Sequence, residues 1–400
     1  MTELREVVVV DALRTAMGRH GGQLAGVRVD ELAAHVISGV VARADVDPAD
    51  VDEVVMGCVN VSGEAMGNVA RYAALLGGLP ETVAGITVNR FCASGLSAIQ
   101  IAAQEIATGQ VDVAVAGGVE SMTRSTWSIP KPDTAFPRTQ LSGRDTMWSG
   151  AGGPYHPALV ERGVMVEMPE TAQNLGGKYA ISREAADAFA LGSHQRAASA
   201  QQDGRFDREI LPLQAGDVAV GRDETIRGDS SLERLAALRP YYPDCPDITA
   251  GNTSQINDGA SALLLTTAER ARAWGAAPLA RVITSSVVGL DPAFMGLGAA
   301  QAIDRALELS GMRLGELDLV EINEAFAVQV LACLEELPIP QERLNVNGGA
   351  IALGHALGNS GARITTTLLH ELRRRGGGIG AASLCVGGGQ GAAMIFEVAA

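Results

Sequence analysis

One cysteine of this chain lies in a sequence context that suits a nucleophile. Cys92 falls within residues 89–96, directly after a predicted strand and at the predicted first turn of a helix. The partial positive charge of a helix N-terminus favours the thiolate, which is the nucleophilic form of cysteine. Inert packing is the common alternative, because free cysteines are among the most buried residues. From this segment alone, both interpretations of Cys92 remain open.

A histidine in a glycine-rich segment could supply the base that such a thiol needs. His355 lies within residues 347–361, which contain Gly348, Gly349, Gly354, Gly358 and Gly361. Glycines let irregular backbone approach another segment without a Cβ clash. The sequence therefore favours His355 as the base for Cys92 over a histidine in a surface loop.

Two further residues stand at the ends of predicted strands. Cys385 precedes a run from Gly387 to Gly389, and residues 392–398 after it have a strand pattern, whereas a dinucleotide fingerprint would open a helix. The glycine N–H groups can instead face an oxyanion, with Cys385 as acid or base. Asn323 can orient a water or donate to an oxyanion; capping the next helix is its more ordinary role.

Predicted strands alternate with predicted helices in both halves of the chain. In the first half we expect strands at residues 7–10, 54–56, 86–88 and 111–116, with helices near 32–40 and 96–106. In the second half we expect strands at residues 281–288, 317–322, 344–346, 382–386 and 392–398, with helices at 299–309 and 362–375. This alternation predicts an α/β protein with parallel strand pairing.

The two halves also match each other in order, which predicts an internal duplication whose units pack face to face. Val88-Asn89 in the first half corresponds to Val346-Asn347 in the second, and Gly117-Gly118 corresponds to Gly387-Gly388. In such an arrangement each of four candidate residues follows a strand, and all four lie at equivalent ends of the two sheets, where open α/β sheets place their sites. These residues are Cys92, Asn323, His355 and Cys385.

Residues 121–250 have a different composition, with tryptophans, several prolines and helical patterns near 171–179 and 182–202. Ser182 is a predicted N-cap and Gly204 a predicted helix stop. An insertion of this length is either a lid or substrate loop, or a contact between subunits. The sequence leaves these two roles equally open.

Composition limits the class of protein. The 400 residues are 47% hydrophobic and 19% charged, which predicts a globular chain with a large core. The net charge of −15 argues against a nucleic-acid partner. Five scattered cysteines without a CxxC pair fit neither a disulfide framework nor a four-cysteine zinc site. We find no signal-peptide pattern and no bilayer-length apolar run, which predicts a cytoplasmic protein without a membrane partner.

Six ordered blocks covering the chain resemble the thiolase family. They are residues 88–96, 117–122, 250–254 with 257–260, 323–327, 347–361 and 385–391. The resemblance implies a duplicated fold of five layers, α-β-α-β-α, with an inserted loop domain. It places the N-terminal half at residues 1–120, completed by about 250–275, the CoA-binding loop domain at 121–249, and the C-terminal half at 276–400.

The resemblance also implies a reaction. His355 would take the proton of Cys92, which would attack the 3-keto carbon of a 3-ketoacyl-CoA, and Cys385 would protonate the departing acetyl-CoA enolate. A second CoA would release the acyl group, and the reverse reaction is a Claisen condensation. The partners implied are acyl-CoA and CoA, with CoA as co-substrate and no permanent cofactor.

Two oxyanions arise in that chemistry, so two sets of donors are needed. By resemblance, Asn323, through a water, and His355 would stabilise the enolate oxygen. The backbone N–H groups of Cys92 and Gly387 would stabilise the oxyanion of the tetrahedral intermediate. Ser254 matches a position that contacts pantetheine, and Arg227 a position near the adenine. Family relatives are homodimers or homotetramers.

The chain departs from the family pattern in three places. Ala356 replaces the usual proline after the histidine, which restores an N–H and loosens the restraint on His355. Ala93 stands where glycine or serine is common. Residues 166–169 differ from the Tyr-His-Met-Gly run of small-substrate biosynthetic thiolases and, with residues 18–22, look more like thiolases of 3-oxoadipyl-CoA and related degradative substrates. Fatty acid β-oxidation is the other role open here.

Two alternatives remain beside a thiolase. Ketoacyl synthases resemble this fold but typically pair the cysteine with two histidines, whereas here Cys385 occupies the place that a thiolase needs. A catalytically idle CoA-binding subunit is the second alternative, which Ala356 makes possible.

Overall fold

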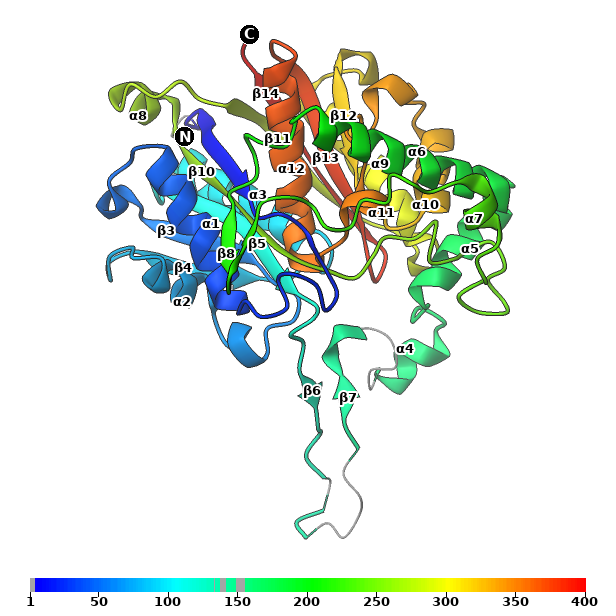
Figure 1. Ribbon diagram of the computed structural model, residues 1–400. Coiled ribbons are helices and arrows are strands. Elements are labelled where there is room, and N and C mark those ends of the chain that lie inside the picture. The colour runs from blue at the N-terminus through cyan, green and yellow to red at the C-terminus, as the bar shows by residue number, and fades with distance from the viewer. Residues whose placement is uncertain (1–3, 133, 137–141, 149–154) are drawn as a thin grey trace.

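The computed structural model describes residues 4–132, 134–136, 142–148 and 155–400 and is built on one mixed sheet of ten strands (Figure 1). The strand order is β12-β13-β14-β11-β1-β10-β5-β3-β4, with β2 paired to β10. The strands are β1 (Val7–Arg14), β2 (Gly18–Arg19), β3 (Glu53–Gly57), β4 (Ala84–Val88), β5 (Val113–Ser121), β10 (Asn257–Thr267), β11 (Ala280–Gly289), β12 (Leu319–Ile322), β13 (Gly378–Val386) and β14 (Gln390–Val398).

The strand order repeats, as an internal duplication requires. The order β3-β5-β10-β1 of the first half recurs as β12-β13-β14-β11 in the second, and the halves join where β1 pairs with β11. Pairing is parallel in β3–β4, β3–β5 and β12–β13 and antiparallel elsewhere. The expectation of parallel pairing throughout is therefore wrong. One reason is the tight turn at Gly388 and Gly389, both with positive φ, which returns β14 directly beside β13.

Helices cover both faces of the two half-sheets and give five layers. Helices α1 (Val29–Arg43) and α2 (Val69–Leu76) cover the outer face of the first half, and α9 (Gly298–Ser310) covers that of the second. Helices α3 (Ser94–Thr108) and α12 (Leu357–Arg374) pack together and contact strands of both halves. The continuous apolar run of β1 suits this position, because its two faces enter separate buried clusters.

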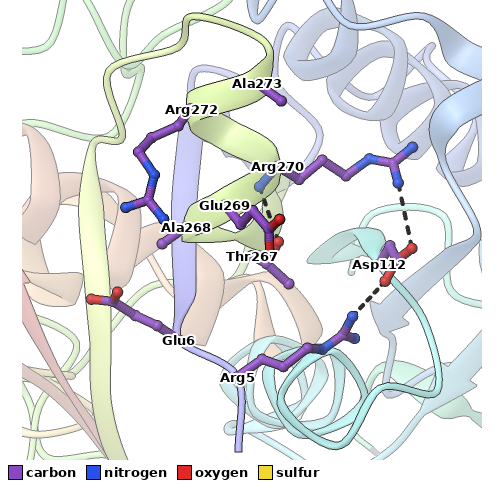
Figure 2. Close-up of a pocket in the computed structure, with 9 residues that line it drawn as sticks. All are labelled: Arg5, Glu6, Asp112, Thr267, Ala268, Glu269, Arg270, Arg272 and Ala273. Atoms are coloured by element: carbon purple, nitrogen blue, oxygen red, sulfur yellow. Dashed lines mark hydrogen bonds and ion pairs between the residues drawn. The ribbon is translucent and has the colours of Figure 1, made fainter.

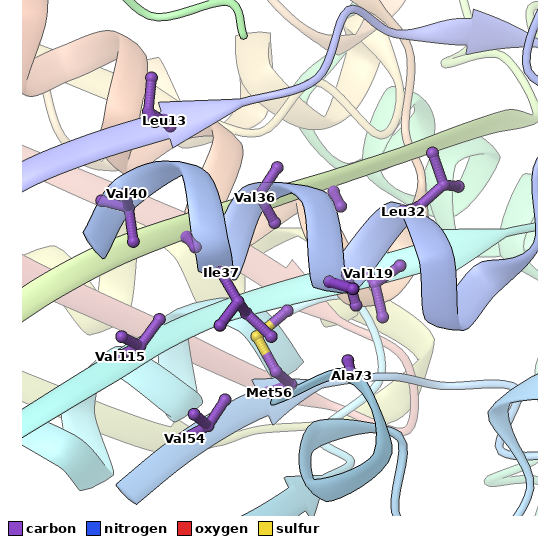
Figure 3. Close-up of a cluster of buried hydrophobic side chains, with 14 of the residues drawn as sticks. Leu13, Leu32, Val36, Ile37, Val40, Val54, Met56, Ala73, Val115 and Val119 are labelled. Carbon is purple, nitrogen blue, oxygen red and sulfur yellow. The ribbon is translucent and has the colours of Figure 1, made fainter. Parts of the chain in front are cut away.

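Figure 3 shows the outer cluster of the first half, in which apolar side chains of α1 lie over β3 and β5. Leu32, Val36, Ile37 and Val40 recur at helical spacing and are fully buried. This packing fixes β3 and β5, and β4, the strand that leads to Cys92, pairs with β3.

Glycines let the two central helices approach closely. A Cβ on Gly95 of α3 would lie 2.8 Å from the carbonyl oxygen of Gly358, and one on Gly361 of α12 would lie 2.3 Å from the amide nitrogen of Leu96. Larger side chains at these positions would force the helices apart. The N-terminal ends of α3 and α12 are thereby brought together, which places the segments carrying Cys92 and His355 side by side.

The inserted segment packs on both halves: side chains from residues 197–226 enter the outer cluster of the first half, and two helices pack on the second. Its helices α5 (Met168–Tyr179) and α6 (Arg183–Gln202) share a buried cluster with α9 and α10 (Ala327–Glu336), and Ser182 caps α6 as predicted, with Gly204 just beyond its end. The boundaries 121–249 stay a prediction. The remaining elements are β6 (Trp127–Ser128), β7 (Arg144–Asp145), α4 (Pro157–Glu161), β8 (Leu213–Ala215), β9 (Val218–Val220), α7 (Leu232–Ala236), α8 (Ala268–Ala273) and α11 (Ala350–Leu353).

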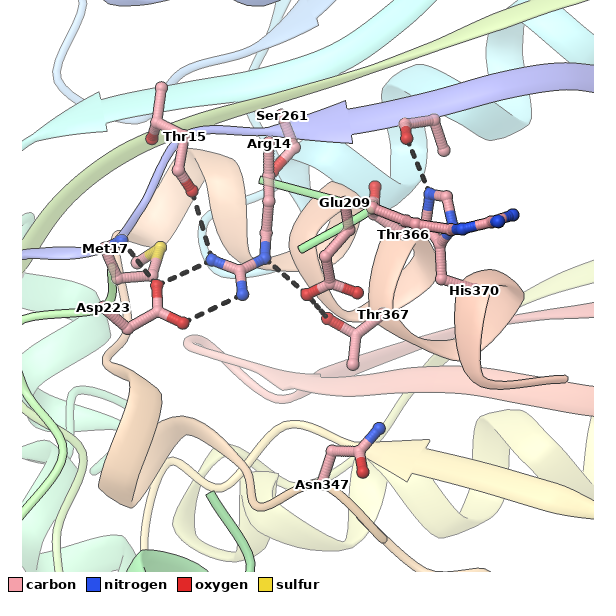
Figure 4. Close-up of polar contacts among 12 residues, drawn as sticks. Arg14, Thr15, Met17, Glu209, Asp223, Ser261, Asn347, Thr366, Thr367 and His370 are labelled. Carbon is pink, nitrogen blue, oxygen red and sulfur yellow. Dashed lines mark hydrogen bonds and ion pairs between the residues drawn. The ribbon is translucent and has the colours of Figure 1, made fainter. Parts of the chain in front are cut away.

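A buried arginine ties the inserted segment to the sheet (Figure 4). The guanidinium of Arg14 on β1 lies 2.6 Å from the Glu209 carboxylate and 2.7 Å from the Asp223 carboxylate. Thr367 of α12 donates to the same Glu209 oxygen at 3.0 Å. The guanidinium makes four hydrogen bonds, to Glu209, Asp223 and the Thr15 carbonyl, and such pairing is the condition under which a buried charge is tolerated.

Two local expectations are wrong. Residues 344–346 form no strand beyond a single bridge of Leu344 to Val320. Instead the Asn345 side chain, from a residue with φ of 42°, both accepts from the Ile322 N–H and donates to its C=O at 2.9 Å, which replaces strand pairing. Gly117 and Gly118 lie inside β5 and not at its end. Both positions need glycine, because backbone atoms of Ser261 and Gly358 approach them too closely for a side chain.

Candidate active site

Cys92 lies in the loop between β4 and α3, two residues before the helix begins at Ser94. The loop is shaped by its own side chains: Asn89 Oδ1 accepts from the Phe91 N–H at 2.9 Å, and Ser94 Oγ donates to the Phe91 carbonyl at 2.6 Å. Phe91 has a φ of 44°, an uncommon value for a residue with a side chain. These contacts hold the thiol at the junction of strand and helix.

The Cys92 thiol is half-buried and is not a stable thiolate in this state. Burial raises its pKa to about 11, although the backbone N–H groups of Gly387 and of Cys92 itself favour the ionised form. The prediction that the helix terminus would favour the thiolate is therefore wrong here. Desolvation outweighs the terminal dipole, whose effect is small beyond the first turn. Cys92 needs a base.

His355 has the geometry of that base. It lies between α11 and α12 and so does not follow a strand, whereas Cys92 and Asn323 do. Its Nδ1 is 2.5 Å from Ser360 Oγ, and Ser360 Oγ donates to the Ala356 carbonyl at 3.0 Å. The hydroxyl has one proton, so it accepts from Nδ1–H, which leaves the lone pair of the imidazole on Nε2.

The surroundings keep this imidazole neutral. Burial, followed by the positive charge of Arg363, lowers the pKa of His355 to about 3. A histidine with that pKa carries no proton on Nε2 at neutral pH and can accept one.

Asn323 follows β12 and faces the same imidazole. Its Nδ2 lies 3.5 Å from His355 Nε2, and its Oδ1 is buried with no hydrogen-bond partner among the described residues. The capping role is wrong, because α10 begins at Ala327 with Phe326 at the N-cap position. An unpartnered buried oxygen beside a base is suited to hold a water or a substrate donor.

Cys385 stands one residue before the end of β13, and its side chain is buried. Burial raises the pKa of its thiol well above the usual value, and the neighbouring thiols of Cys92 and Cys333 raise it further. The thiol therefore keeps its proton at neutral pH and can act as an acid. The influence of Cys92 on this thiol, together with the Gly387 N–H at the Cys92 sulfur, shows that the two cysteines are neighbours.

Ser254 and Arg227, the two residues matched to CoA-binding positions, lie near Gln255, which contacts His355. The His355 N–H lies 3.3 Å from the Gln255 carbonyl, and the neighbouring Ser254 N–H donates to the Ala325 carbonyl at 3.0 Å. The Gln255 side chain in turn accepts from exposed Arg227 at 3.4 Å. Gln255 thus links Arg227 to the backbone of His355, and Ser254 is the residue before Gln255 in the chain.

Three positioning residues were missed by the sequence reasoning. Asn257 Oδ1 accepts from the His355 N–H at 2.9 Å, and Ser360 holds the imidazole. Glu324 accepts from the Ile351 N–H at 3.1 Å and from Ser193 Oγ at 2.7 Å, which fixes α11 before His355. All three lie inside the blocks already noted, but nothing in a linear pattern says which polar side chain contacts which backbone.

The departures from the family pattern have local explanations. Ala356 has a φ of −77°, within reach of proline, and His355 is restrained by Asn257 and Ser360 instead of by a proline ring. Ala93 has a φ of −96°, so the side chain costs no strain. Neither substitution displaces the base or the thiol.

A surface pocket between α8 and the start of β1 contains none of these residues (Figure 2). Three of its charged side chains are paired with one another: Arg5 lies 2.5 Å and Arg270 3.4 Å from the Asp112 carboxylate. In the part of the chain that is described, no cluster of three or more His, Cys, Asp or Glu could hold a metal, and no helix has the length and apolarity to cross a bilayer.

Comparison with known proteins identifies the family. Residues 7–269 match the thiolase N-terminal domain model and residues 276–398 the thiolase C-terminal domain model. The chain therefore belongs to the thiolase family and is a CoA-dependent acyltransferase.

Individual relatives match over nearly their whole length. A β-ketoadipyl-CoA thiolase of Pseudomonas aeruginosa is 46% identical over 98% of this chain and 99% of its own. The 3-oxoadipyl-CoA/3-oxo-5,6-dehydrosuberyl-CoA thiolase of Escherichia coli is 43% identical over 98% of this chain and 100% of its own. The structure of a Bacillus anthracis acetyl-CoA acetyltransferase matches with a TM-score of 0.93 at 43% identity, each chain fully covered. The ketoacyl synthase and idle-subunit alternatives are not favoured.

Proposed function

We propose that this chain cleaves a 3-ketoacyl-CoA by thiolysis, or runs the reverse condensation, through an acyl group carried on Cys92. The close packing of α3 and α12 supports this most, because it brings the segment of the neutral His355 imidazole beside that of Cys92, whose thiol needs a base and neighbours the protonated Cys385 thiol. His355 takes the Cys92 proton as the sulfur attacks the keto carbon. Cys385 then protonates the enolate of the departing acetyl-CoA, and a second CoA accepts the acyl group.

The same geometry suggests where the two oxyanions are stabilised. The backbone N–H groups of Cys92 and Gly387 already favour negative charge at the sulfur and are suited to the tetrahedral intermediate. Asn323 and His355, with a water on the unpartnered Oδ1, are suited to the enolate oxygen. We assign pantetheine to Ser254 and the adenine end to Arg227, with residues 121–249 as the CoA-binding loop domain, CoA as co-substrate and no permanently bound cofactor.

Selective alkylation tests whether Cys92 is the nucleophile. We expect iodoacetamide to modify Cys92 at least about tenfold faster than Cys58 at pH 7, because Cys58 is fully buried and has no base. Prior acetylation by acetyl-CoA should protect Cys92 alone, as read by peptide mass spectrometry. Equal labelling of the two cysteines without protection would exclude the proposed chemistry.

We further propose a dicarboxylic 3-ketoacyl-CoA of the 3-oxoadipyl-CoA type as the substrate. Residues 166–169 and 18–22 support this substrate, as do relatives named as β-ketoadipyl-CoA and 3-oxoadipyl-CoA thiolases. We therefore favour it over a substrate of fatty acid β-oxidation.

Thiolysis kinetics test this substrate. We expect kcat/KM for 3-oxoadipyl-CoA to exceed that for 3-ketohexanoyl-CoA, which has the same chain length without the carboxylate, by about tenfold or more, since a site built for a charged group rejects the analogue that lacks it. Acetoacetyl-CoA serves as the short control. A preference for the uncharged substrate would contradict the proposal.

We propose that two copies pair along the free edge of β4, in a homodimer or a homotetramer built from dimers. This strand ends the sheet, and apolar side chains beside it are exposed: Ile86 by 40%, Leu76 by 56% and Tyr72 by 57%. An exposed apolar edge strand is a template for pairing with another chain.

A charge on this edge should separate the copies. We expect Ile86→Lys to elute as a monomer in size exclusion with light scattering, because a lysine on an edge strand opposes strand addition. Leu309→Lys is the matched control, since Leu309 on α9 is similarly exposed but lies elsewhere. An oligomer that survives Ile86→Lys but not Leu309→Lys would place the interface on another face.

A further inference from the structure

A buried carboxylate joins the two segments that lead to the thiol and to the base. Glu120 is the last residue but one of β5 and is 2% exposed. Its Oε2 accepts from the Val59 N–H and from the Gly358 N–H, each at 2.9 Å, and its Oε1 accepts from the Asn60 N–H at 3.0 Å. Burying a carboxylate is costly unless donors satisfy its oxygens, and here the donors come from backbone segments that are distant in the chain.

One of these segments is the start of the helix that follows the base. Gly358 is the second residue of α12 and stands three residues after His355. The N-cap residue, Ala356, has no side chain that could cap this helix, so Glu120 supplies an acceptor for one of its N-terminal N–H groups. The carboxylate therefore fixes the position at which α12 begins, and Ser360 of the same turn lies 2.5 Å from the imidazole.

The other segment follows β3 and leads to the thiol. The Val59 carbonyl accepts from Asn89 Nδ2 at 3.1 Å. Asn89 Oδ1 accepts in turn from the Phe91 N–H at 2.9 Å, which shapes the backbone immediately before Cys92. The contacts thus run from Glu120 through the backbone of Val59 and one amide side chain to the loop of the nucleophile.

We propose that Glu120 is a positioning residue that sets the Cys92 loop and the start of α12 relative to each other, so that the His355 imidazole can take the thiol proton. This inference rests on the proposed role of His355 as the base and adds what holds the two groups in place. A carboxylate suits the task because it only accepts, whereas an amide would turn its own N–H₂ group toward at least one of the three N–H donors.

A double-mutant cycle between Glu120 and His355 tests the proposal. The rate to measure is acetylation of Cys92 by saturating acetyl-CoA at pH 7, read in a single turnover by intact-protein mass. We expect Glu120→Gln to lower this rate by about 10- to 100-fold, because a displacement of about 1 Å between reacting groups has an effect of that order. In the His355→Gln background, where no base remains to be positioned, the same change should cost less than about twofold.

The charge of Glu120 cannot produce the same result, because it acts in the opposite direction. Burial raises the pKa of the Cys92 thiol, and the negative charge of Glu120 adds to that effect. Removing the charge alone would therefore favour the thiolate and speed acetylation. A slower reaction in Glu120→Gln reports position and not charge.

Glu371→Gln is the matched control for a buried carboxylate. Glu371 is 3% exposed and lies near the opposite end of α12, where it accepts from Asn347, Arg374 and Arg375. Its replacement should change the acetylation rate by less than about twofold in either background, on the order expected for a change that only affects packing.

Equal losses for Glu120→Gln in the two backgrounds would overturn the proposal, because a residue that only supports the fold acts whether or not the base is present. Coupling of the same size between Glu371→Gln and His355→Gln would overturn it as well. A His355→Gln variant that is acetylated as fast as the unaltered chain would be a different failure, since it would refute the proposed base and this inference together.

If Glu120→Gln does not fold, Asn89→Asp decides. This change keeps the acceptor for the Phe91 N–H and removes the donor to the Val59 carbonyl, so it breaks the connection at a residue that is exposed. We expect a loss of acetylation that disappears in the His355→Gln background. A loss of equal size in both backgrounds would contradict the proposal.

Discussion

Replacing His355 by glutamine should lower the rate of thiolysis at pH 7 by about 10³-fold, the usual contribution of a general base. The physical reason is the pKa of about 11 for the Cys92 thiol. Without a base, only the spontaneously ionised thiol reacts, which is about one part in 10⁴ at pH 7.

The same variant should acquire a pH dependence that the unaltered enzyme lacks. Its acylation rate should rise about tenfold per pH unit from pH 7 to pH 10, because the thiolate fraction rises in that proportion below the pKa. The unaltered enzyme should be nearly flat there, since His355 is neutral throughout. Single-turnover acylation by acetyl-CoA measures both.

His370→Gln is the matched control for this experiment. His370 lies far along α12 and contacts the Ala12 carbonyl at 2.9 Å, away from the thiols, so its loss should leave the acylation rate unchanged. A His355→Gln variant with a flat profile and a near-normal rate would show that another group deprotonates Cys92.

Removing either thiol should abolish turnover, but at different steps. Cys92→Ala should form no acyl-enzyme and lose thiolysis completely, because the atom that carries the acyl group is absent. Cys385→Ala should still take an acetyl group from acetyl-CoA onto Cys92, while thiolysis of a 3-ketoacyl-CoA falls by about 10³-fold for want of the acid. Intact-protein mass and a thiolysis assay separate the two.

Cys333→Ala provides the comparison for both variants. Cys333 is as buried as Cys385 and close enough to raise its pKa, yet its own thiol donates to the Gly296 carbonyl at 3.2 Å. We expect thiolysis within about twofold of the unaltered rate, on the order expected for a change that only affects packing. Loss of acetylation in Cys385→Ala would mean that this cysteine positions Cys92 and is not only an acid.

Much of the architecture could be predicted because it depends on local patterns. The apolar run of β1, the period of α1 and the helix after Cys92 each follow from spacing, and a repeated order predicts duplication. Strand direction could not be predicted, since the residues between two strands do not show whether the chain crosses over or turns back. The strand predicted at residues 344–346 is absent for a similar reason. The Asn345 side chain supplies the hydrogen bonds that a neighbouring strand would have made.

The protonation states of the site were even less accessible. The helix position of Cys92 predicted a thiolate, and only the surrounding atoms reveal that burial raises its pKa instead. The tautomer of His355 likewise depends on a hydroxyl five residues away, whose own proton is committed to the Ala356 carbonyl.

The sequence by itself determined which family the chain belongs to and which residues are candidates for its chemistry, because residue type and order are linear properties. The tertiary structure alone decided how those residues act: which thiol keeps its proton, which imidazole nitrogen is free, and which buried carboxylate joins their segments. Charge states depend on desolvation and on partners distant in the chain, and these exist only once the two halves have packed around α3 and α12.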